Sequence, residues 1–384
     1  MGASLMEAFR EATARSAARL LAGQPPRRET VDAEAILSLL LHHKLGPLGS
    51  WRASRSQAWR VRLEGEALKR LDATVLPARI RRMMVVDALG DALDVIGDLR
   101  PVLFKGLAAA EVYPEPHLRD PGDLDLLLTP EATDEAVRRL EEAGWRIERT
   151  VHSHLPPAVL RRHGIATILR HPRRPVVIDL HRALVDRTEP FRLDSEAFLA
   201  HRRRLSFEEG LEVDVPEREE HLMLLALHSV RHGHFRLGWS LDVHLACELW
   251  MESLDPERLA ACCRRGKVRR AVRVGLEVAR ALYGTRRHPL DTVPMDRPTY
   301  RAIRRRSPGV IARGHLVRGR GRRVQGLLDL LEGPGEQAKY LFRLAFPPRD
   351  LLSDEGGNPP GWGQYVRKRV KVAVELLRGR AEES

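Results

Sequence analysis

The hydrophobic residues of this chain change their spacing near its middle, and this change constrains the fold more than any other feature. Up to about Gly97 they recur at helical spacing, as in the segment AEAILSLLLHHKL, without a convincing alternating strand. Short apolar runs separated by turns follow, and helical spacing returns after about Pro190. Because helices and strands bury their apolar residues with different periods, a strand-containing segment is expected between two helical ones.

The short apolar runs mark the expected strands. They are residues 101–104, 123–128, 165–170 and 176–180. The last two have the spacing of an antiparallel pair. The segment LAAAEVY, residues 107–113, favours a helix, and Thr129-Pro130 opens another with a capping residue followed by proline. We therefore predict an α+β fold in three parts: a helical N-terminal region (1–97), a mixed-sheet α/β core (98–215) and a helical C-terminal region (216–384).

Composition excludes several classes of protein. With 384 residues, 43% of them apolar and 30% charged, the chain is globular in character. No stretch approaches the roughly 18 to 20 consecutive apolar residues of a membrane span, and charged residues interrupt the start, where a signal peptide would be apolar. We expect a cytoplasmic protein with no membrane partner. Cys262 and Cys263 are adjacent and Cys247 stands alone, which suits neither a disulfide framework nor a four-ligand zinc site.

The chain is strongly basic, and its charge is uneven. The formal net charge is +13, but only seven of the 65 basic residues are lysine, a skew that biased coding composition also explains. Nine arginines and no acidic residue lie between Arg301 and Gln325. The segment from Arg301 to Arg323 is either a patch for nucleic acid or another polyanion, or a solvated basic surface.

Paired aspartates give the first indication of chemistry. Alternation along a strand would place Asp123 and Asp125 on one face, roughly 6.5 Å apart at the backbone. Asp179 ends a second apolar strand and is the natural third carboxylate. Such a set repels itself unless a cation lies between its members, and two Mg²⁺ ions beside phosphates are a common solution. The alternative is a solvated strand end with an unrelated surface acid.

A lysine and a glycine precede these aspartates. Lys105 and Gly106 lie where an apolar strand meets a helix, so a cation and free backbone amides are available for a triphosphate. Arg119, in the loop before the aspartates, either adds a two-pronged phosphate contact or forms a surface salt bridge.

Three histidines complete the candidates. His228 and His232 are four apart on an expected helix and therefore share a face. They are candidates for contact with the substrate or a metal, or they pack against neighbouring helices. His181 either lines the site or orients Asp179 by a hydrogen bond.

Three segments of the chain resemble a known family. They are VLFKGLAAAEVYPEPHLRDPGDLDLLLTPEATDEAVRRLEEAGW, VVIDLHRAL and LALHSVRHGHFRLGWSLDVHL. Together they resemble a bacterial family of uncharacterised nucleotidyltransferases within the DNA polymerase beta-like nucleotidyltransferase superfamily. The resemblance extends over most of the chain and is most specific over residues 102–145.

This resemblance implies a polymerase beta-like mixed sheet, two Mg²⁺ ions and a nucleoside triphosphate donor such as ATP. Asp123 and Asp125 match the paired metal carboxylates, and Asp179 matches the third, as base or ligand near the acceptor. The chain departs from the superfamily in having Lys105-Gly106 where many members have Gly-Ser, and in the sixteen residues between Gly106 and Asp123.

The leading hypothesis is therefore a Mg²⁺-dependent nucleotidyltransferase. The alternative is a catalytically inactive relative that binds nucleic acid or another polyanion through its Arg-rich segment. A third hypothesis is the modification of a protein partner. The sequence leaves open the donor base, the acceptor and the oligomeric state.

Overall fold

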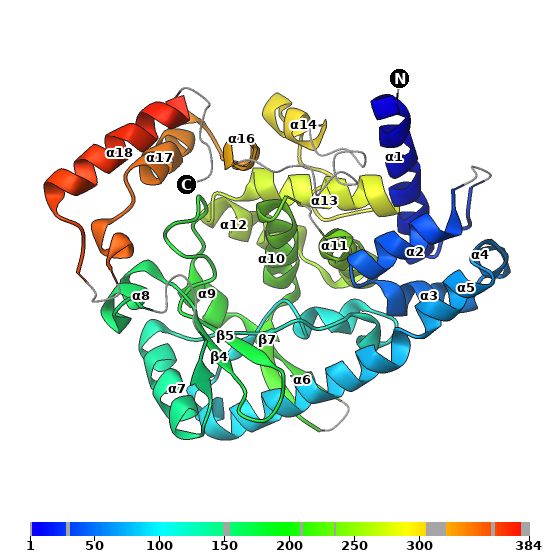
Figure 1. Ribbon diagram of the computed structural model, residues 1–384, viewed down its shortest axis with the longest axis horizontal. Helices are drawn as coiled ribbons and strands as arrows, with labels where there is room; N and C mark the ends of the chain where they lie inside the picture. Colours follow the sequence, from blue (N-terminus) through cyan, green and yellow to red (C-terminus); the bar gives the residue numbers. More distant parts are fainter. Residues whose placement is uncertain are drawn as a thin grey trace.

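A seven-stranded mixed sheet occupies the middle of the molecule (Figure 1). The computed structural model describes residues 2–27, 31–148, 154–207, 210–233, 236–304, 320–354 and 358–377. The strands are β1 (Val102–Leu103), β2 (Leu124–Leu127), β3 (Arg146–Ile147), β4 (Thr167–Arg170), β5 (Val177–His181), β6 (Arg202–Ser206) and β7 (Glu212–Pro216). Their order in the sheet is β3-β4-β5-β2-β1-β7-β6.

The sheet mixes parallel and antiparallel pairs, which confirms the α+β prediction. β2 runs parallel to β5, and β1 runs parallel to β7. The pairs β1–β2, β3–β4, β4–β5 and β6–β7 are antiparallel. The expected antiparallel pair at residues 165–180 is thus confirmed as β4 and β5.

Helices surround the sheet. Those before it are α1 (Gly2–Leu21), α2 (Ala33–His42), α3 (Gly46–Ser54), α4 (Gln57–Arg62), α5 (Glu66–Asp72), α6 (Val75–Ile96) and the 3-10 turn η1 (Gly97–Leu99). Those among the strands are η2 (Ala108–Val112), η3 (Pro116–Leu118), α7 (Pro130–Glu142), α8 (Pro157–His163) and α9 (Ser195–Ala200).

Further helices follow the last strand. They are α10 (Arg218–Arg231), α11 (Leu237–Trp250), η4 (Met251–Ser253), α12 (Pro256–Arg265), α13 (Arg269–Tyr283), α14 (Arg297–Arg304), α16 (Arg320–Leu328), α17 (Pro334–Ala345), η5 (Arg349–Leu352) and α18 (Trp362–Leu377). No helix in the described part of the chain combines the length and apolar character needed to cross a membrane.

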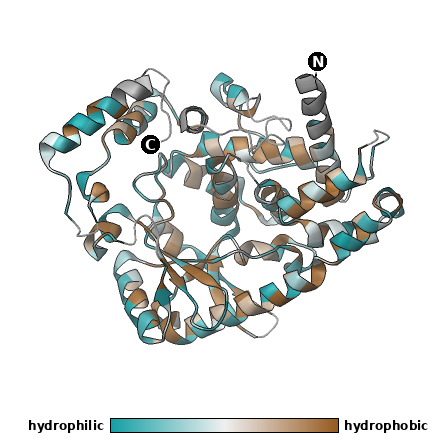
Figure 2. Ribbon diagram, in the orientation of Figure 1, coloured by the Kyte–Doolittle hydropathy of each residue, from teal (hydrophilic) through white to brown (hydrophobic). Residues whose placement is uncertain are grey.

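The two faces of the sheet bury different residues. Leu124, Leu126, Ile178 and Leu180 belong to a cluster with α6 and α7, whereas Leu127 packs with residues of α9 and α10. In the view of Figure 1, α6 runs beneath the sheet and α10 lies above it. Figure 2 shows the hydrophobic strands enclosed between these helices. The residues that alternate with the leucines of the first cluster therefore face α10.

A second core joins segments that are far apart in sequence. It contains residues of α1 to α5 together with residues of α10 to α13, and Leu20, Ile36, Leu241 and Val272 are fully buried within it. The N-terminal helices therefore pack against the C-terminal ones, beside the sheet (Figure 1).

Two local predictions were wrong. The return to helices after Pro190 overlooked β6 and β7. β6 ends the sheet, and its RRRLS sequence has one apolar residue, so it lacks the apolar alternation expected of a strand. The expected helix at 107–113 is only the 3-10 helix η2. Pro114 follows Tyr113, whose backbone is extended, as the residue before a proline favours.

The Arg-rich segment is only partly described. Arg301 lies exposed on α14, but residues 305–319 lie outside the described residues. Binding of a polyanion by residues 301–323 therefore stays a prediction.

Candidate active site

The parallel pairing of β2 with β5 places two carboxylates side by side. Asp125 and Asp179 are register partners on these neighbouring strands. Asp123 directly precedes β2 and shares its alternation with Asp125. Since the intervening leucines face α6 and α7, these aspartates face α10 and line one cavity. The structure thus gathers on one face the three carboxylates selected from the sequence.

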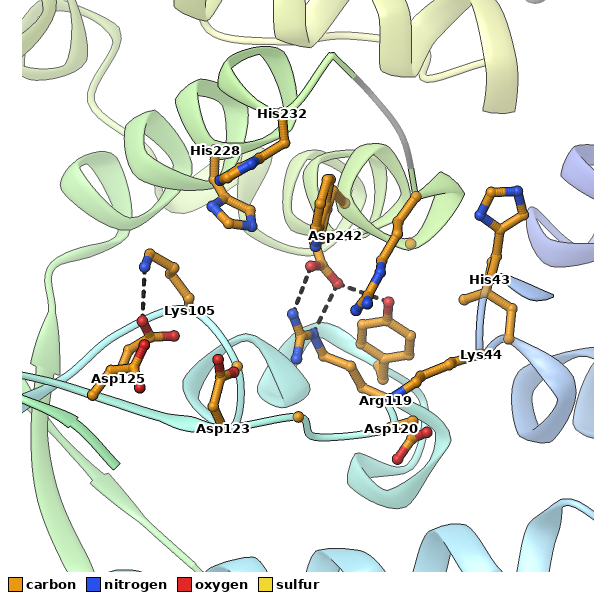
Figure 3. Close-up of a pocket in the computed structure, with 18 of the residues that line it drawn as sticks. His43, Lys44, Lys105, Arg119, Asp120, Asp123, Asp125, His228, His232 and Asp242 are labelled. Atoms are coloured by element: carbon orange, nitrogen blue, oxygen red, sulfur yellow. Dashed lines mark hydrogen bonds and ion pairs between the residues drawn. The ribbon is translucent and has the colours of Figure 1, made fainter. Parts of the chain in front are cut away.

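Asp125 is the most buried of the three aspartates, and it contacts a lysine and a histidine. Lys105 Nζ lies 2.8 Å from Asp125 Oδ1 (Figure 3). His181 Nε2 lies 2.9 Å from the same oxygen. Burial alone would raise the pKa of Asp125, but the Lys105 ammonium and the His181 hydrogen bond hold it well below the usual range. Asp125 is therefore ionised at any physiological pH.

Asp179 has the opposite electrostatic environment. Burial, followed by the negative charges of Asp125 and Asp123, raises the pKa of Asp179 to about 7. Burial and the charge of Asp125 also raise the pKa of Asp123. The protein's own cations therefore do not fully compensate the negative charges of these carboxylates.

The donor atoms that converge most closely differ from the predicted trio. Asp125, Asp179 and His181 each offer one ligand atom, and these atoms lie within 4.8 Å of one another. Asp123 lines the same cavity but is not a member of this group. Two carboxylates and an imidazole fit a divalent cation, and the oxygens suit Mg²⁺. His181 contacts Asp125 and not Asp179, the residue that the sequence suggested it would orient.

The turn of Lys105 and Gly106 has an unusual backbone. Both residues have positive φ, +58° and +22°. A Cβ atom at Gly106 would lie 2.9 Å from the carbonyl oxygen of Asp123, closer than packing allows. Glycine at 106 therefore lets the turn approach the carboxylate strand, while the Lys105 ammonium pairs with Asp125.

Arg119 is neither exposed nor free. Its Nε lies 3.0 Å from Asp242 Oδ1, and its Nη2 lies 2.9 Å from Oδ2 (Figure 3). The hydroxyl of Tyr113 also donates to Asp242, at 2.7 Å. Burial alone would lower the pKa of Arg119, but the Asp242 carboxylate raises it above its usual value. Of the two alternatives for Arg119, a salt bridge forms, but it is enclosed beside the cavity and does not lie on the surface, and the phosphate contact stays a prediction.

His228 and His232 lie across the cavity from the aspartates and form an aromatic group with Trp239 (Figure 3). The three ring centroids are 4.6 to 5.0 Å apart. Burial, and next the positive charges of Lys105 and His232, hold the pKa of His228 well below its usual range. His228 and His232 belong to no group of three metal-ligating side chains found in the described parts of the chain.

One cavity of about 340 Å³ contains all nine residues selected from the sequence. It is also lined by residues outside that selection: His43, Lys44, Leu45, Tyr113, Asp120, Gly122, Arg236, Gly238, Trp239 and Asp242. Asp242 carried a local signal, because an aspartate within the apolar run WSLDVHL needs a buried partner. Lys44 carried no such local signal, because it follows a helix that is remote in sequence from the strands.

A second group of possible ligands is already neutralised. Glu277, His288 and Asp291 also bring donor atoms within 4.8 Å of one another. Arg273 contacts Glu277 at 2.7 Å, and Arg280 contacts both Glu277 and Asp291. This group is an ion-pair network that joins α13 to the segment after it.

A comparison with protein families agrees with this geometry. A family model described as an uncharacterised nucleotidyltransferase matches residues 29–284, which is more than half of the chain and includes every residue selected for the site. No curated protein matches the chain.

Proposed function

Because the chain belongs to this family of uncharacterised nucleotidyltransferases, we propose that it is a Mg²⁺-dependent enzyme. It would move a nucleotidyl group from a nucleoside triphosphate to an acceptor that is a small molecule or a peptide. The observation that carries the proposal is the register of Asp125 with Asp179 at the floor of the cavity. Such a pair at one sheet face suits a divalent cation, and phosphates are the usual substrates beside it.

Asp125 and Asp179 would hold the metal, and Asp123 lines the same cavity beside them. His181 contacts Asp125, so it would orient this carboxylate as a hydrogen-bond partner, since Mg²⁺ prefers oxygen ligands. When bound, Mg²⁺ would stabilise the negative charge that develops on the transferred phosphate and the leaving pyrophosphate.

Lys105 would serve two purposes. In the protein alone its ammonium neutralises Asp125 at 2.8 Å. Its flexible stem would let the ammonium turn to a phosphate oxygen once another cation neutralises the carboxylate. The Gly106 amide lies beside it and would donate to the same phosphates.

Arg119 and Asp242 would position the site. Their ion pair connects the loop before β2 to α11, so it holds Asp123 and the residues before it against the helices above. His228, His232 and Trp239 present ring surfaces to the cavity and would contact the donor base or the acceptor. Asp179 would act as a shared metal ligand or as the base that receives the acceptor proton.

The experiment compares the wild type with Asp123→Asn/Asp125→Asn. Two readouts are Mn²⁺ binding, which needs no acceptor, and Mg²⁺-dependent pyrophosphate release from each nucleoside triphosphate with candidate acceptors. The double variant is expected to lose release by at least about a hundredfold, because only Asp179 of the three carboxylates would remain for the metal. Asp94→Asn, at an exposed position on α6, is the matched control. Release retained in the double variant would refute the metal assignment.

A further inference from the structure

The cavity has a second end, near Asp120 and away from Asp125, that basic residues line (Figure 3). Lys44 and Arg236 line it, although 192 positions separate them in the sequence. Lys44 follows the end of α2, and Arg236 directly precedes α11. Figure 3 shows the Lys44 side chain extending toward the loop that carries Arg119 and Asp120.

A hydrogen bond between their neighbours holds these two residues at one corner. The backbone N–H of Leu237 donates to His43 Nδ1, at 3.4 Å. Lys44 is next to His43, and Arg236 is next to Leu237, so the end of α2 and the start of α11 are joined where both cations stand. His43 is itself 8% exposed, so this hydrogen bond is enclosed, whereas the side chains of Lys44 and Arg236 are exposed to solvent.

The other charges near this end are already paired. Asp242 neutralises Arg119, Asp125 neutralises Lys105, and Arg81 contacts both oxygens of Asp120. Lys44 and Arg236, by contrast, have no carboxylate partner among the described residues. Lys44 and Arg236 are therefore the basic residues of this cavity whose charges are available to a ligand. Neither was selected from the sequence.

Lys44 also has a backbone conformation that rarely suits a lysine. Its φ is +58°. Lys44 N–H bonds to the Leu41 carbonyl and Leu45 N–H to the Leu40 carbonyl, a helix ending in which glycine usually takes the left-handed position. A basic residue near a helix C-terminus is ordinary, but a lysine at the left-handed position keeps strain that glycine would remove.

We propose that Lys44 and Arg236 form a phosphate-binding subsite opposite the carboxylate end of the cavity. This inference rests on the proposed function, because it assigns part of a substrate to the same cavity. The phosphate belongs either to the terminal phosphates of the nucleotide donor or to a phosphorylated acceptor. Arginine matches two phosphate oxygens at once and lysine adds a point charge, so the pair can hold a group that carries two negative charges.

The test measures pyrophosphate binding by calorimetry, first in EDTA and then with Mg²⁺. Lys44→Gly removes the ammonium and also relieves the left-handed backbone, so loss of folding cannot explain its effect. Lys267→Gly is the matched control, because Lys267 also has positive φ (+51°) but lies outside the cavity. Arg236→Gln is compared with Arg173→Gln, an exposed arginine elsewhere.

In EDTA, Lys44→Gly and Arg236→Gln are each expected to weaken pyrophosphate binding at least tenfold, with both controls within twofold of the wild type. If the subsite serves the donor, both variants also weaken binding of ATP with Mg²⁺. If it serves the acceptor, ATP binding persists, and the variants instead weaken binding of inorganic phosphate to the ATP-saturated protein.

The subsite would be overturned if the wild type bound no detectable pyrophosphate in EDTA. It would also be overturned if both variants lost less than threefold in pyrophosphate affinity. Asp125→Asn separates this result from the metal proposal. The subsite predicts that this variant still binds pyrophosphate in EDTA, whereas the proposed function predicts that it loses Mg²⁺-dependent pyrophosphate release.

Discussion

Arg119 and Asp242 form a two-pronged ion pair across 123 positions of sequence, with contacts of 3.0 and 2.9 Å. The side chain of Asp242 is only 3% exposed and that of Arg119 is 14% exposed. Removing one member leaves the other charge enclosed without a partner, which costs far more than the intact pair contributes. The pair therefore governs the stability of the cavity wall as well as its shape.

Arg119→Met is expected to lower the free energy of unfolding by about 3 to 5 kcal/mol. Arg119→Met/Asp242→Leu should cost less than the sum of the two single changes, because neither charge is then left alone. Tyr113→Phe, which removes one hydrogen bond to Asp242, should cost about 1 kcal/mol. Urea unfolding of the four variants measures the coupling, and additive costs would contradict it.

Gly106→Ala is expected to disrupt the site. Its new methyl group would lie 2.9 Å from the Asp123 carbonyl oxygen, and the positive φ adds strain. We expect a loss of about 1 to 3 kcal/mol in unfolding free energy and weaker Mn²⁺ binding. Gly122→Ala is the control, since its methyl group would meet nothing within 4 Å on the same cavity. Equal effects of the two changes would rule out this explanation.

The stability of the metal-free protein should depend on pH through Asp179. Its pKa is raised from 3.8 to about 7, so between these values the folded state binds a proton that the unfolded state lacks. The contribution of Asp179 to the free energy of unfolding is therefore greatest below pH 3.8, and it is lost as the pH rises through 7. The loss is at most about 4 kcal/mol, and solvent screening reduces it because Asp179 is partly exposed.

Chemical unfolding in EDTA from pH 4 to pH 8 measures this dependence. Asp179→Asn should show a smaller loss of stability than the wild type across that range. Parallel stability curves for the two proteins would show that Asp179 does not titrate there.

Mg²⁺ should raise the melting temperature of the wild type. A ligand that binds only the folded state stabilises it by about 2.7 kcal/mol at a hundred times its dissociation constant. Asp125→Asn should remove most of this increase, because Asp125 is the carboxylate that stays ionised at physiological pH. Asp94→Asn should retain it. A Mg²⁺-dependent increase of equal size in Asp125→Asn would place the metal elsewhere.

Local sequence patterns were sufficient for the strand that carries the paired aspartates. The alternation of leucine and aspartate from 123 to 128 predicted both the strand β2 and the common face of Asp123 and Asp125. The same reasoning missed β6 at the end of the sheet, because its RRRLS sequence contains only one apolar residue. It also missed Asp242 as the partner of Arg119, because helical spacing indicates that a residue is buried but not what it contacts.

The sequence by itself determined the α+β composition, the carboxylate strands and the Lys105-Gly106 turn, because periodicity and backbone preference act over a few neighbouring residues. Only the tertiary structure decided that Asp125 lies beside Asp179, that Arg119 is paired with Asp242, and that Lys44 reaches the same cavity. These contacts join residues more than 50 positions apart. They depend on strand register and helix packing, which the whole core sets together and no single segment encodes.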